Sequence, residues 1–330
     1  MHKINIIIPS ISIDERLIRC LDGIQKLNYK KFFVTLILEN KRNLSKLKKF
    51  KFIIKALAIK KVNMSEKRNF AAKKFSSDFL AFIDSDACPN KNWLSNAVKI
   101  MKSKKISIIG GPNMPFKNET FSQKISYYCK RSFFVTANYS FINYMSKNRY
   151  CEFLHSSNFI IDRKVFLSVK GMNEDLYIGE DHDLFSRLKE KNKNIKVYFD
   201  KKIFVYHEDR PFNLFLMQRF CYGLNVFTSN NSISKRTLSL IPLLSIILIS
   251  FLLLSFSQLY LTVLLLLIIF SSIIVFLNIN KYIKKFTTKM LVIICIYLSN
   301  IFYGLGTIVY FLGFRNFIEK KIYRNIKKEK

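Results

Sequence analysis

Short apolar runs alternate with helical patterns along roughly the first 200 residues of the chain. The runs at 4–8, 32–38 and 79–83 are each closed by polar residues or proline, which predicts buried strands. Apolar positions recur at helical spacing after Asp14 and after Ser65, so helices are expected there. Strands alternating with helices are typical of an α/β domain with a doubly wound, parallel sheet.

The same patterns extend this prediction to about residue 225. Further strands are expected at 52–59, 106–109, 157–161, 195–199 and 203–206, and further helices at 93–101, at 162–169 and from 179. The stretch 113–150 is aromatic and polar, and its pattern favours neither element.

The pattern changes near residue 237, where long apolar runs begin. Residues 238–256 and 259–277 are uncharged and about as long as a bilayer span. A third apolar stretch at 290–312 either spans the membrane, re-enters it or lies in its interface. We therefore expect a domain at 1–236, transmembrane segments within 237–313 and a basic amphipathic tail on anionic lipid at 314–330.

The net charge and the cysteines indicate the cellular compartment of the protein. The net charge of +33 indicates polyanions or an anionic membrane surface, unless the lysines are simply solvated. Six scattered cysteines without a C-x-x-C fit a reducing compartment, and the apolar run at 4–8 is too short for a signal peptide. The positive-inside rule assigns Lys235, Arg236 and the lysines at 281–289 to the cytoplasm. We predict a multi-pass cell-membrane protein with a cytoplasmic domain; the side of the tail stays open.

The residues that could bind a metal ion or a ligand lie where the predicted strands end. Asp84 and Asp86 follow the run at 79–83, and alternation along an extended chain would put both carboxylates on one side. Like charges this close favour a divalent ion such as Mg²⁺ bridging to a diphosphate, although Asp-Ser-Asp is also a common turn. Pro9-Ser10 and Glu39-Asn40 fall on the same edge, where open α/β sheets bind ligands.

Two later positions have both a structural and a functional interpretation. Glu180 and Asp181 open a predicted helix after Gly179, where carboxylates are favoured by the helix dipole, but one of them could also serve as a general base. His207 ends a predicted strand, either as a structural residue or as a metal ligand.

Taken in order, these features resemble the family 2 glycosyltransferases of the inverting GT-A type. The matching pieces are INIIIPS at 4–10, Lys67-Arg68-Asn69, Asp84-Ser85-Asp86 followed by Trp93-Leu94, Gly171 with Asn173-Glu174, Gly179-Glu180-Asp181, His207, and Arg219 with Gly223. They span about residues 4 to 225.

The resemblance implies a role for several of these positions. Pro9, Ser10, Glu39, Arg68, Asp84 and Arg219 would bind the donor nucleotide-sugar. Asp84, Asp86 and His207 would hold Mg²⁺ or Mn²⁺, and Asp181 would be the catalytic base. Glu39 departs from the family, which usually has Asp there. Arg219 could equally be an arginine at the membrane surface.

The resemblance also implies a function, which is transfer of a sugar from a nucleotide-diphospho-sugar to a hydroxyl of a lipid-linked or other glycan acceptor at the membrane. Cell-surface polysaccharide or glycoconjugate assembly would be the setting, with no nucleic-acid partner and an open oligomeric state. One alternative is a polyprenyl-phosphate glycosyltransferase. Another is a non-catalytic membrane scaffold that binds polyanions through its lysines.

Overall fold

A computed structural model of the chain describes residues 2–40, 42–59, 62–227 and 258–315, together with a few residues between 244 and 251 and residue 318. Contacts divide the chain into two compact units. The first comprises Met1–Lys117 and Phe141–Glu208, and the second comprises Asn118–Ser140 and Asp209–Lys330. The domain boundary proposed at residue 236 from the sequence stays a prediction.

The first unit is built on an eight-stranded sheet. Its strands, in spatial order, are β3 (Ile54–Ala58), β2 (Phe32–Leu38), β1 (Ile4–Pro9), β4 (Phe79–Ile83), β9 (Asn158–Asp162), β6 (Ile108–Gly110), β10 (Val197–Phe199) and β8 (Arg149–Cys151). The first four are parallel, as the alternation of strands and helices predicts. The expectation of a wholly parallel sheet is wrong at β9, which runs antiparallel to both β4 and β6, and at β8. β9 begins at the edge of the sheet where β6 ends, with Phe159 opposite Gly110, and therefore runs back along β6; the chain between them contributes β8 to the same sheet.

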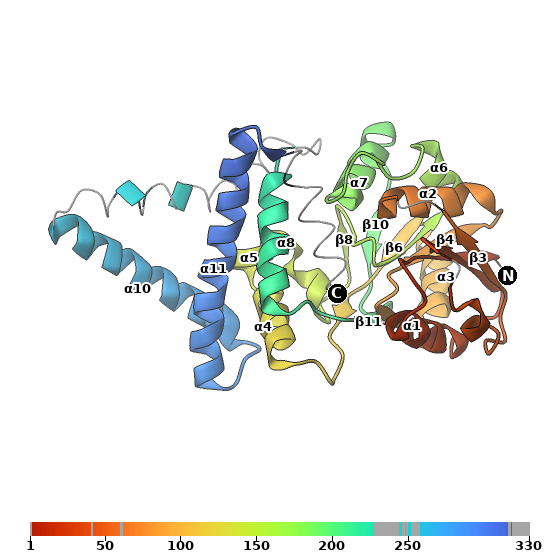
Figure 1. The fold of residues 1–330 in the computed structure, drawn as a ribbon, viewed down its shortest axis with the longest axis horizontal. Helices are drawn as coiled ribbons and strands as arrows, with labels where there is room; N and C mark the ends of the chain where they lie inside the picture. The colour runs from red at the N-terminus through yellow and green to blue at the C-terminus, as the bar shows by residue number, and fades with distance from the viewer. Residues whose placement is uncertain are drawn as a thin grey trace. The chain divides into compact units, whose positions relative to one another are not determined.

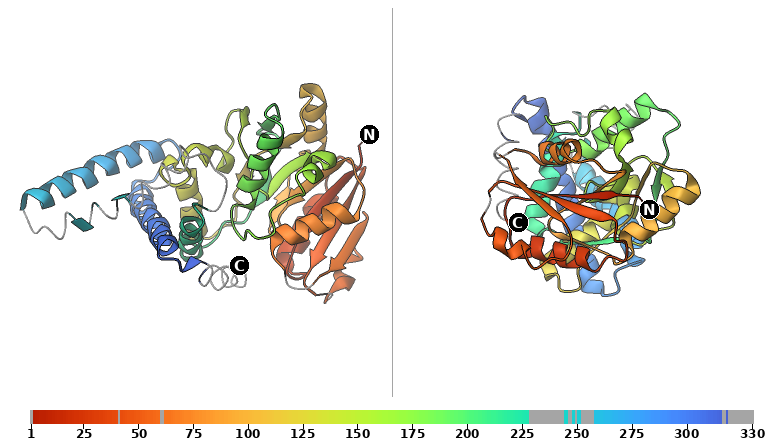
Figure 2. Two further views of the ribbon diagram at one scale, coloured as in Figure 1. Left: turned by 90° about the horizontal axis from the view of Figure 1, so that it is seen from above. Right: turned by 90° about the vertical axis from the view of Figure 1, so that its right-hand side faces the viewer.

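Helices cover both faces of this sheet (Figures 1 and 2). One face carries α1 (Glu15–Gln25) and α3 (Trp93–Lys104), and the other carries α2 (Met64–Lys74), α6 (Arg163–Ser168) and α7 (Glu180–Lys191). Successive side chains of β4 point to opposite faces of the sheet, so this strand contributes to the core on both faces. Ala81 and Ile83 join the core under α1 and α3, while the Phe82 ring contacts Phe159 and Phe166 on the opposite face.

Local signals fix where two of the helices begin. The Asp14 carboxylate accepts a hydrogen bond from the Leu17 N–H at 2.9 Å, as expected of an N-cap. Before α2, the Asn63 side chain accepts from the Glu66 N–H, and Glu66 accepts in return from the Asn63 N–H. This capping box fixes the start of α2 and hence the position of the residues that α2 carries.

A second, three-stranded sheet lies in the same unit. It consists of β5 (Ala87–Pro89), β11 (Val205–His207) and β7 (Asn113–Met114) in that order. β5 and β11 pair antiparallel, with His207 opposite Ala87. This register brings the end of β11 beside the segment that follows β4. A short 3-10 helix, η1 (Leu44–Leu47), and a second, η2 (Ala137–Asn143), complete the short elements.

The second unit is helical. It contains α4 (Phe121–Arg131), α5 (Phe133–Thr136), α8 (Phe212–Leu224), α10 (Gln258–Asn280) and α11 (Phe286–Phe311). α8 lies along α11 (Figures 1 and 2), and two glycines bring their backbones close. A Cβ atom on Gly223 would lie 2.0 Å from the Tyr303 carbonyl oxygen, and one on Gly306 would lie 2.0 Å from that of Phe220. Neither position can accept a larger residue unless the helices separate.

Among the residues of this unit that the structure describes, two helices are long and apolar enough to cross a membrane. They are Leu261–Asn280, with a mean hydropathy of 2.8, and Phe286–Phe311, with a mean hydropathy of 2.0. They match the apolar segments predicted at 259–277 and 290–312. The segment predicted at 238–256 and the tail at 314–330 lie almost entirely outside the described residues.

Candidate functional site

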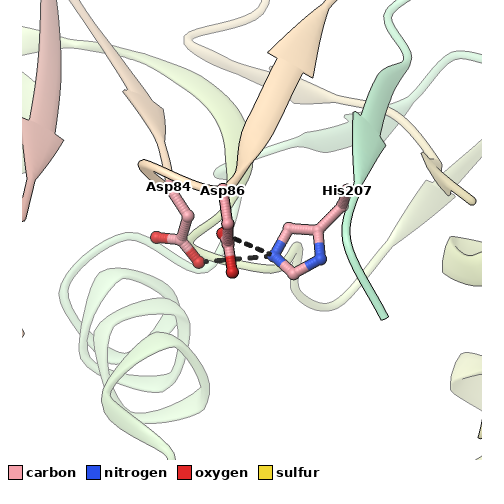
Figure 3. A group of neighbouring side chains, drawn as sticks. All are labelled: Asp84, Asp86 and His207. Carbon is pink, nitrogen blue, oxygen red and sulfur yellow. Dashed lines mark ion pairs between the residues drawn. The ribbon is translucent and has the colours of Figure 1, made fainter. Parts of the chain in front are cut away.

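The carboxyl end of β4 carries two carboxylates that face one imidazole (Figure 3). Asp84 and Asp86 lie in a tight turn closed by a hydrogen bond from the Ala87 N–H to the Asp84 carbonyl, and not in the extended chain expected from the sequence. His207 Nε2 lies 3.6 Å from Asp84 Oδ2 and 3.4 Å from Asp86 Oδ1. The pairing of β11 with β5 delivers the imidazole to this place.

These three side chains fit a divalent cation. One ligand atom from each of Asp84, Asp86 and His207 lies within 4.8 Å of the other two. The Asp86 side chain is 10% exposed and that of His207 is 14% exposed, whereas Asp84 is about one-third exposed. Two partly desolvated carboxylates repel each other, and a hard cation relieves that repulsion. Carboxylate oxygens with a neutral imidazole are suitable ligands for Mg²⁺ or Mn²⁺.

A fully buried lysine joins the ends of β1 and β2. The Lys67 ammonium donates to the Ser10 carbonyl at 2.7 Å and to Glu39 Oε1 at 2.9 Å. Burial lowers the pKa of Lys67, an effect that the hydrogen bond and charge of Glu39 oppose. Ser10 directly follows Pro9, the last residue of β1. The structure thus brings Ser10 and Glu39 together, and their donor-binding role stays a prediction.

Arg68, the next residue of α2, links two further carboxylates. Its guanidinium donates to Asp84 Oδ1 at 2.8 Å and to Glu180 Oε1 at 3.2 Å. The Arg68 side chain is 3% exposed and that of Glu180 is 14% exposed. The first turn of α7 is therefore tied to the end of β4 through one buried cation.

The third member of this tripeptide, Asn69, fixes the turn that precedes α7. Its amide accepts from the Met172 N–H and donates to the Met172 carbonyl and to Glu174 Oε1, at 2.7–2.8 Å. Gly171 has φ of +81°, and a Cβ there would lie 2.2 Å from Asn69 Oδ1. Asn63 also donates to the Glu174 carbonyl. These contacts explain why the Lys67-Arg68-Asn69 and Gly171–Glu174 motifs occur together.

Asp181, the candidate base, lies in the first turn of α7 with its side chain 13% exposed. Its carboxylate accepts from the Ser156 N–H at 3.4 Å and from the His182 N–H at 2.9 Å, and His155 Nδ1 lies 3.5 Å away. Burial acts to raise the pKa of Asp181. The hydrogen bond from His155 and the charges of His182 and His155 outweigh burial and lower this pKa to about 2. Asp181 is therefore ionised at neutral pH.

Arg219 belongs to the second unit. It is buried on α8, where its guanidinium donates to Asn300 Oδ1 at 3.2 Å and lies over the Tyr303 ring at 4.6 Å. Both partners are on α11. These contacts give Arg219 a role in packing the two helices, and its predicted role in donor binding remains a prediction.

Sequence reasoning missed three features of the site. It did not predict β5, because Ala87–Pro89 is short and ends in proline. It did not single out His155, although His155 precedes the β9 strand much as Asp84 follows β4. Nor did it connect Arg68 with Glu180, a pairing across 112 residues that no local pattern indicates.

The mixed sheet, the acidic pair and histidine at its edge, and the carboxylate at the start of α7 fit the GT-A glycosyltransferase fold that the sequence resembles. The chain belongs to glycosyl transferase family group 2, whose family model matches residues 79–305. Among the curated proteins none matches the chain in sequence.

One solved structure supports the fold, and a second is similar over part of its length. The mannosyltransferase PcManGT from Pyrobaculum calidifontis, in complex with GDP-Man and Mn²⁺, is 12% identical with a TM-score of 0.60, covering 91% of this chain and 87% of that one. S. aureus TarS is 15% identical with a TM-score of 0.47, covering 71% of this chain. The match spans 41% of the TarS chain.

Proposed function

We propose that this chain is an inverting glycosyltransferase that moves a sugar from a nucleotide-diphospho-sugar to a hydroxyl group of a membrane-associated acceptor. The observation that carries the proposal is the cluster of Asp84, Asp86 and His207 at the carboxyl edge of the sheet, linked through Arg68 to the first turn of α7. Ligands of open α/β sheets bind at this edge.

The donor's diphosphate is the group that suits the acidic cluster. Mg²⁺ or Mn²⁺ held by Asp84, Asp86 and His207 would supply positive charge to stabilise the leaving nucleoside diphosphate. Ser10 and Glu39, which Lys67 holds in place, lie at the ends of the neighbouring strands β1 and β2 and would bind the nucleoside.

Asp181 would act on the acceptor. An ionised carboxylate can accept the proton of the acceptor hydroxyl as its oxygen attacks the anomeric carbon from the face opposite the diphosphate. The proton moves from the hydroxyl to Asp181, the new glycosidic bond forms, and the bond to the diphosphate breaks. One displacement of this kind inverts the anomeric configuration.

The acceptor is proposed to be a lipid-linked glycan, with the first unit on the cytoplasmic side. Two helices of sufficient length and hydropathy support attachment to a membrane, and the lysines at 281–289 lie next to them. Basic residues beside a span favour the cytoplasmic side.

The test measures release of nucleoside diphosphate by the full-length protein in detergent. A panel of nucleotide sugars is supplied with Mn²⁺ or Mg²⁺ and a short-chain polyprenyl-diphosphate monosaccharide, and polyprenyl phosphate is tried in parallel. The variants are Asp86→Ala and Asp181→Asn. Asp22→Asn is the matched control, because Asp22, on α1, is a half-exposed carboxylate paired with Lys49.

We expect one donor to turn over, with Asp86→Ala inactive and Asp22→Asn unchanged. Asp181→Asn should be slower by a factor on the order of 10²–10⁴, the usual contribution of a general base. If polyprenyl phosphate is the better acceptor and Asp181→Asn retains its rate, the hydroxyl acceptor is wrong, because a phosphate needs no base. If no donor turns over, the non-catalytic scaffold replaces the transferase.

A further inference from the structure

A second imidazole stands beside the candidate base, away from the acidic cluster. His155 lies in the segment that leads into β9, and its Nδ1 is 3.5 Å from Asp181 Oδ2. Its side chain is about one-third exposed, whereas that of Asp181 is 13% exposed. One edge of the dyad is therefore open to solvent and the other is enclosed.

Phe153 fixes the orientation of the histidines around this carboxylate. Its ring is 3% exposed and stacks on His182, with ring centroids 3.7 Å apart and an interplanar angle of 30°. The same ring meets His155 edge-on, at 5.4 Å and 84°. An imidazole held by a buried aromatic ring has little freedom to turn, so the short distance from His155 to Asp181 is a property of the site.

The neighbouring residue completes the arrangement. Ser156 gives its N–H to Asp181 Oδ2 and its hydroxyl to Glu180 Oε1, the latter at 3.3 Å. Glu180 is in turn bonded to Arg68. The segment that carries His155 thus holds both carboxylates of the first turn of α7, so that Asp181 can turn in only a few directions.

The charges in this region decide how strong a base Asp181 is. The charged or titratable groups that act on it are His182 from its own helix and His155 from the segment before β9, and Ser156 joins it to Glu180, which bonds Arg68 on α2. Glu180 is paired with Arg68, and Asp183 is paired with Arg187 at 2.7 Å. A cation next to a carboxylate reduces its proton affinity, which returns when the cation becomes neutral. Histidine is the side chain that changes its charge near neutral pH.

We propose that His155 is a positioning residue of the transfer reaction, an inference that rests on the proposed function. It donates from Nδ1 to Asp181, aims the free carboxylate oxygen at the acceptor hydroxyl, and adjusts the basicity of Asp181 through its own charge. With His155 neutral, Asp181 takes the acceptor's proton. With His155 protonated, Asp181 remains ionised but holds a proton too weakly to assist the attack.

The test compares three variants of the full-length protein in detergent. His155→Asn keeps an N–H donor near the position of Nδ1 but cannot be charged. His155→Leu keeps volume and loses the donor. His2→Asn makes the same chemical change at a half-exposed histidine beside Asp78, and is the matched control. The rate of nucleoside diphosphate release, with the donor that turns over and the polyprenyl-diphosphate monosaccharide, is followed from pH 5.5 to 8.0.

The expected sizes follow from ordinary imidazole chemistry. Histidine is the side chain that gains its charge between neutral and mildly acidic pH, so the wild type and His2→Asn should lose several-fold in kcat/KM between pH 8.0 and 5.5. His155→Asn should keep most of its rate at pH 8.0 and lose much less on acidification. His155→Leu should lose about tenfold in kcat at pH 8.0, with an unchanged KM for the donor.

Two results would overturn the proposal. One is an acid limb in His155→Asn equal to that of the wild type. The other is a His155→Asn protein as inactive at pH 8.0 as Asp181→Asn, which would make His155 itself the base.

A second readout does not depend on turnover. Thermal unfolding of the wild type, His155→Asn, Asp181→Asn and the double variant forms a cycle, and non-additive shifts are expected at pH 5.5 but much less at pH 8.0. Additive shifts of the Tm at both pH values would show that His155 and Asp181 do not interact, even if the enzyme is active. Non-additive shifts of the Tm in a protein that uses no donor would support the interaction between His155 and Asp181 but contradict the proposed transferase activity.

Discussion

Replacing Arg68 by methionine should destabilise the first unit through the two carboxylates it leaves behind. Arg68→Met keeps the apolar stem and removes the guanidinium that bonds Asp84 at 2.8 Å and Glu180 at 3.2 Å. The Glu180 side chain is 14% exposed, so its charge would remain largely desolvated after losing this cation. Truncating one side of a buried ion pair costs about 3–5 kcal/mol.

The lower end of that range applies here. The Asp84 side chain is about one-third exposed, so water can solvate its charge when the Arg68 guanidinium is removed. A loss of about 3 kcal/mol lowers the Tm of a unit of this size by roughly 10 °C, since each kcal/mol corresponds to about 2–4 °C for 150–250 residues. Glu180→Gln in the same chain should recover part of the loss, because the desolvated charge is then absent.

The protein carries its own reporter for this measurement. Trp93, the single tryptophan, is fully buried in the first unit and donates from Nε1 to Asn158 Oδ1 at 2.8 Å. Its fluorescence on heating follows the unfolding of that unit. Arg42→Met, at an exposed arginine, is the matched control and should leave the Tm unchanged. An Arg68→Met protein that melts with the wild type, or a double variant no more stable than Arg68→Met, would refute this reasoning.

Three further outcomes are expected. His207→Ala should weaken Mn²⁺ binding at least tenfold by calorimetry without donor, since even a residue behind the ligands contributes that much, and equal affinity would remove His207 from the site. Gly223→Ala should lower the Tm of the second unit in detergent, because its Cβ would lie 2.0 Å from the Tyr303 carbonyl oxygen, whereas an unchanged Tm would contradict that packing. Because the pKa of Asp181 is lowered from 3.8 to about 2, its carboxylate contributes about 2 kcal/mol of stability above pH 4, which is lost as the pH falls toward 2. The stability difference from Asp181→Asn should therefore shrink over that range, and a constant difference would argue against the lowered pKa.

Most of the first unit follows from short-range patterns in the sequence. The runs that predicted β1, β2 and β4 match their observed bounds within a residue, and Asp14 caps α1 as expected. The helix expected from 179 is α7, on which Leu184, Phe185 and Leu188 lie at helical spacing and are all buried. These features depend on neighbours within one turn or one strand, which periodicity and capping chemistry describe well.

What the sequence could not provide depends on pairing between distant segments. An apolar run predicts a strand but not its direction, so the reversal of β9 was not expected. β5 becomes a strand only because β11 pairs with it. The grouping of Asp84, Asp86 and His207 came from the family resemblance, and the contact of His155 with Asp181 became visible only when the segment before β9 was placed against α7.

The reversed strand β9 also affects how the protein can be dissected. β6 ends and β9 begins at one edge of the sheet, and the chain between them contains 118–140, which belongs to the second unit. A protein cut after Glu208 would keep that segment without α8 and α11, exposing buried residues such as Ile125 and Cys129. The first unit is a discontinuous folding unit. A water-soluble fragment for crystallisation would therefore require excision of 118–140 and rejoining of the ends, in addition to removal of the helices that follow.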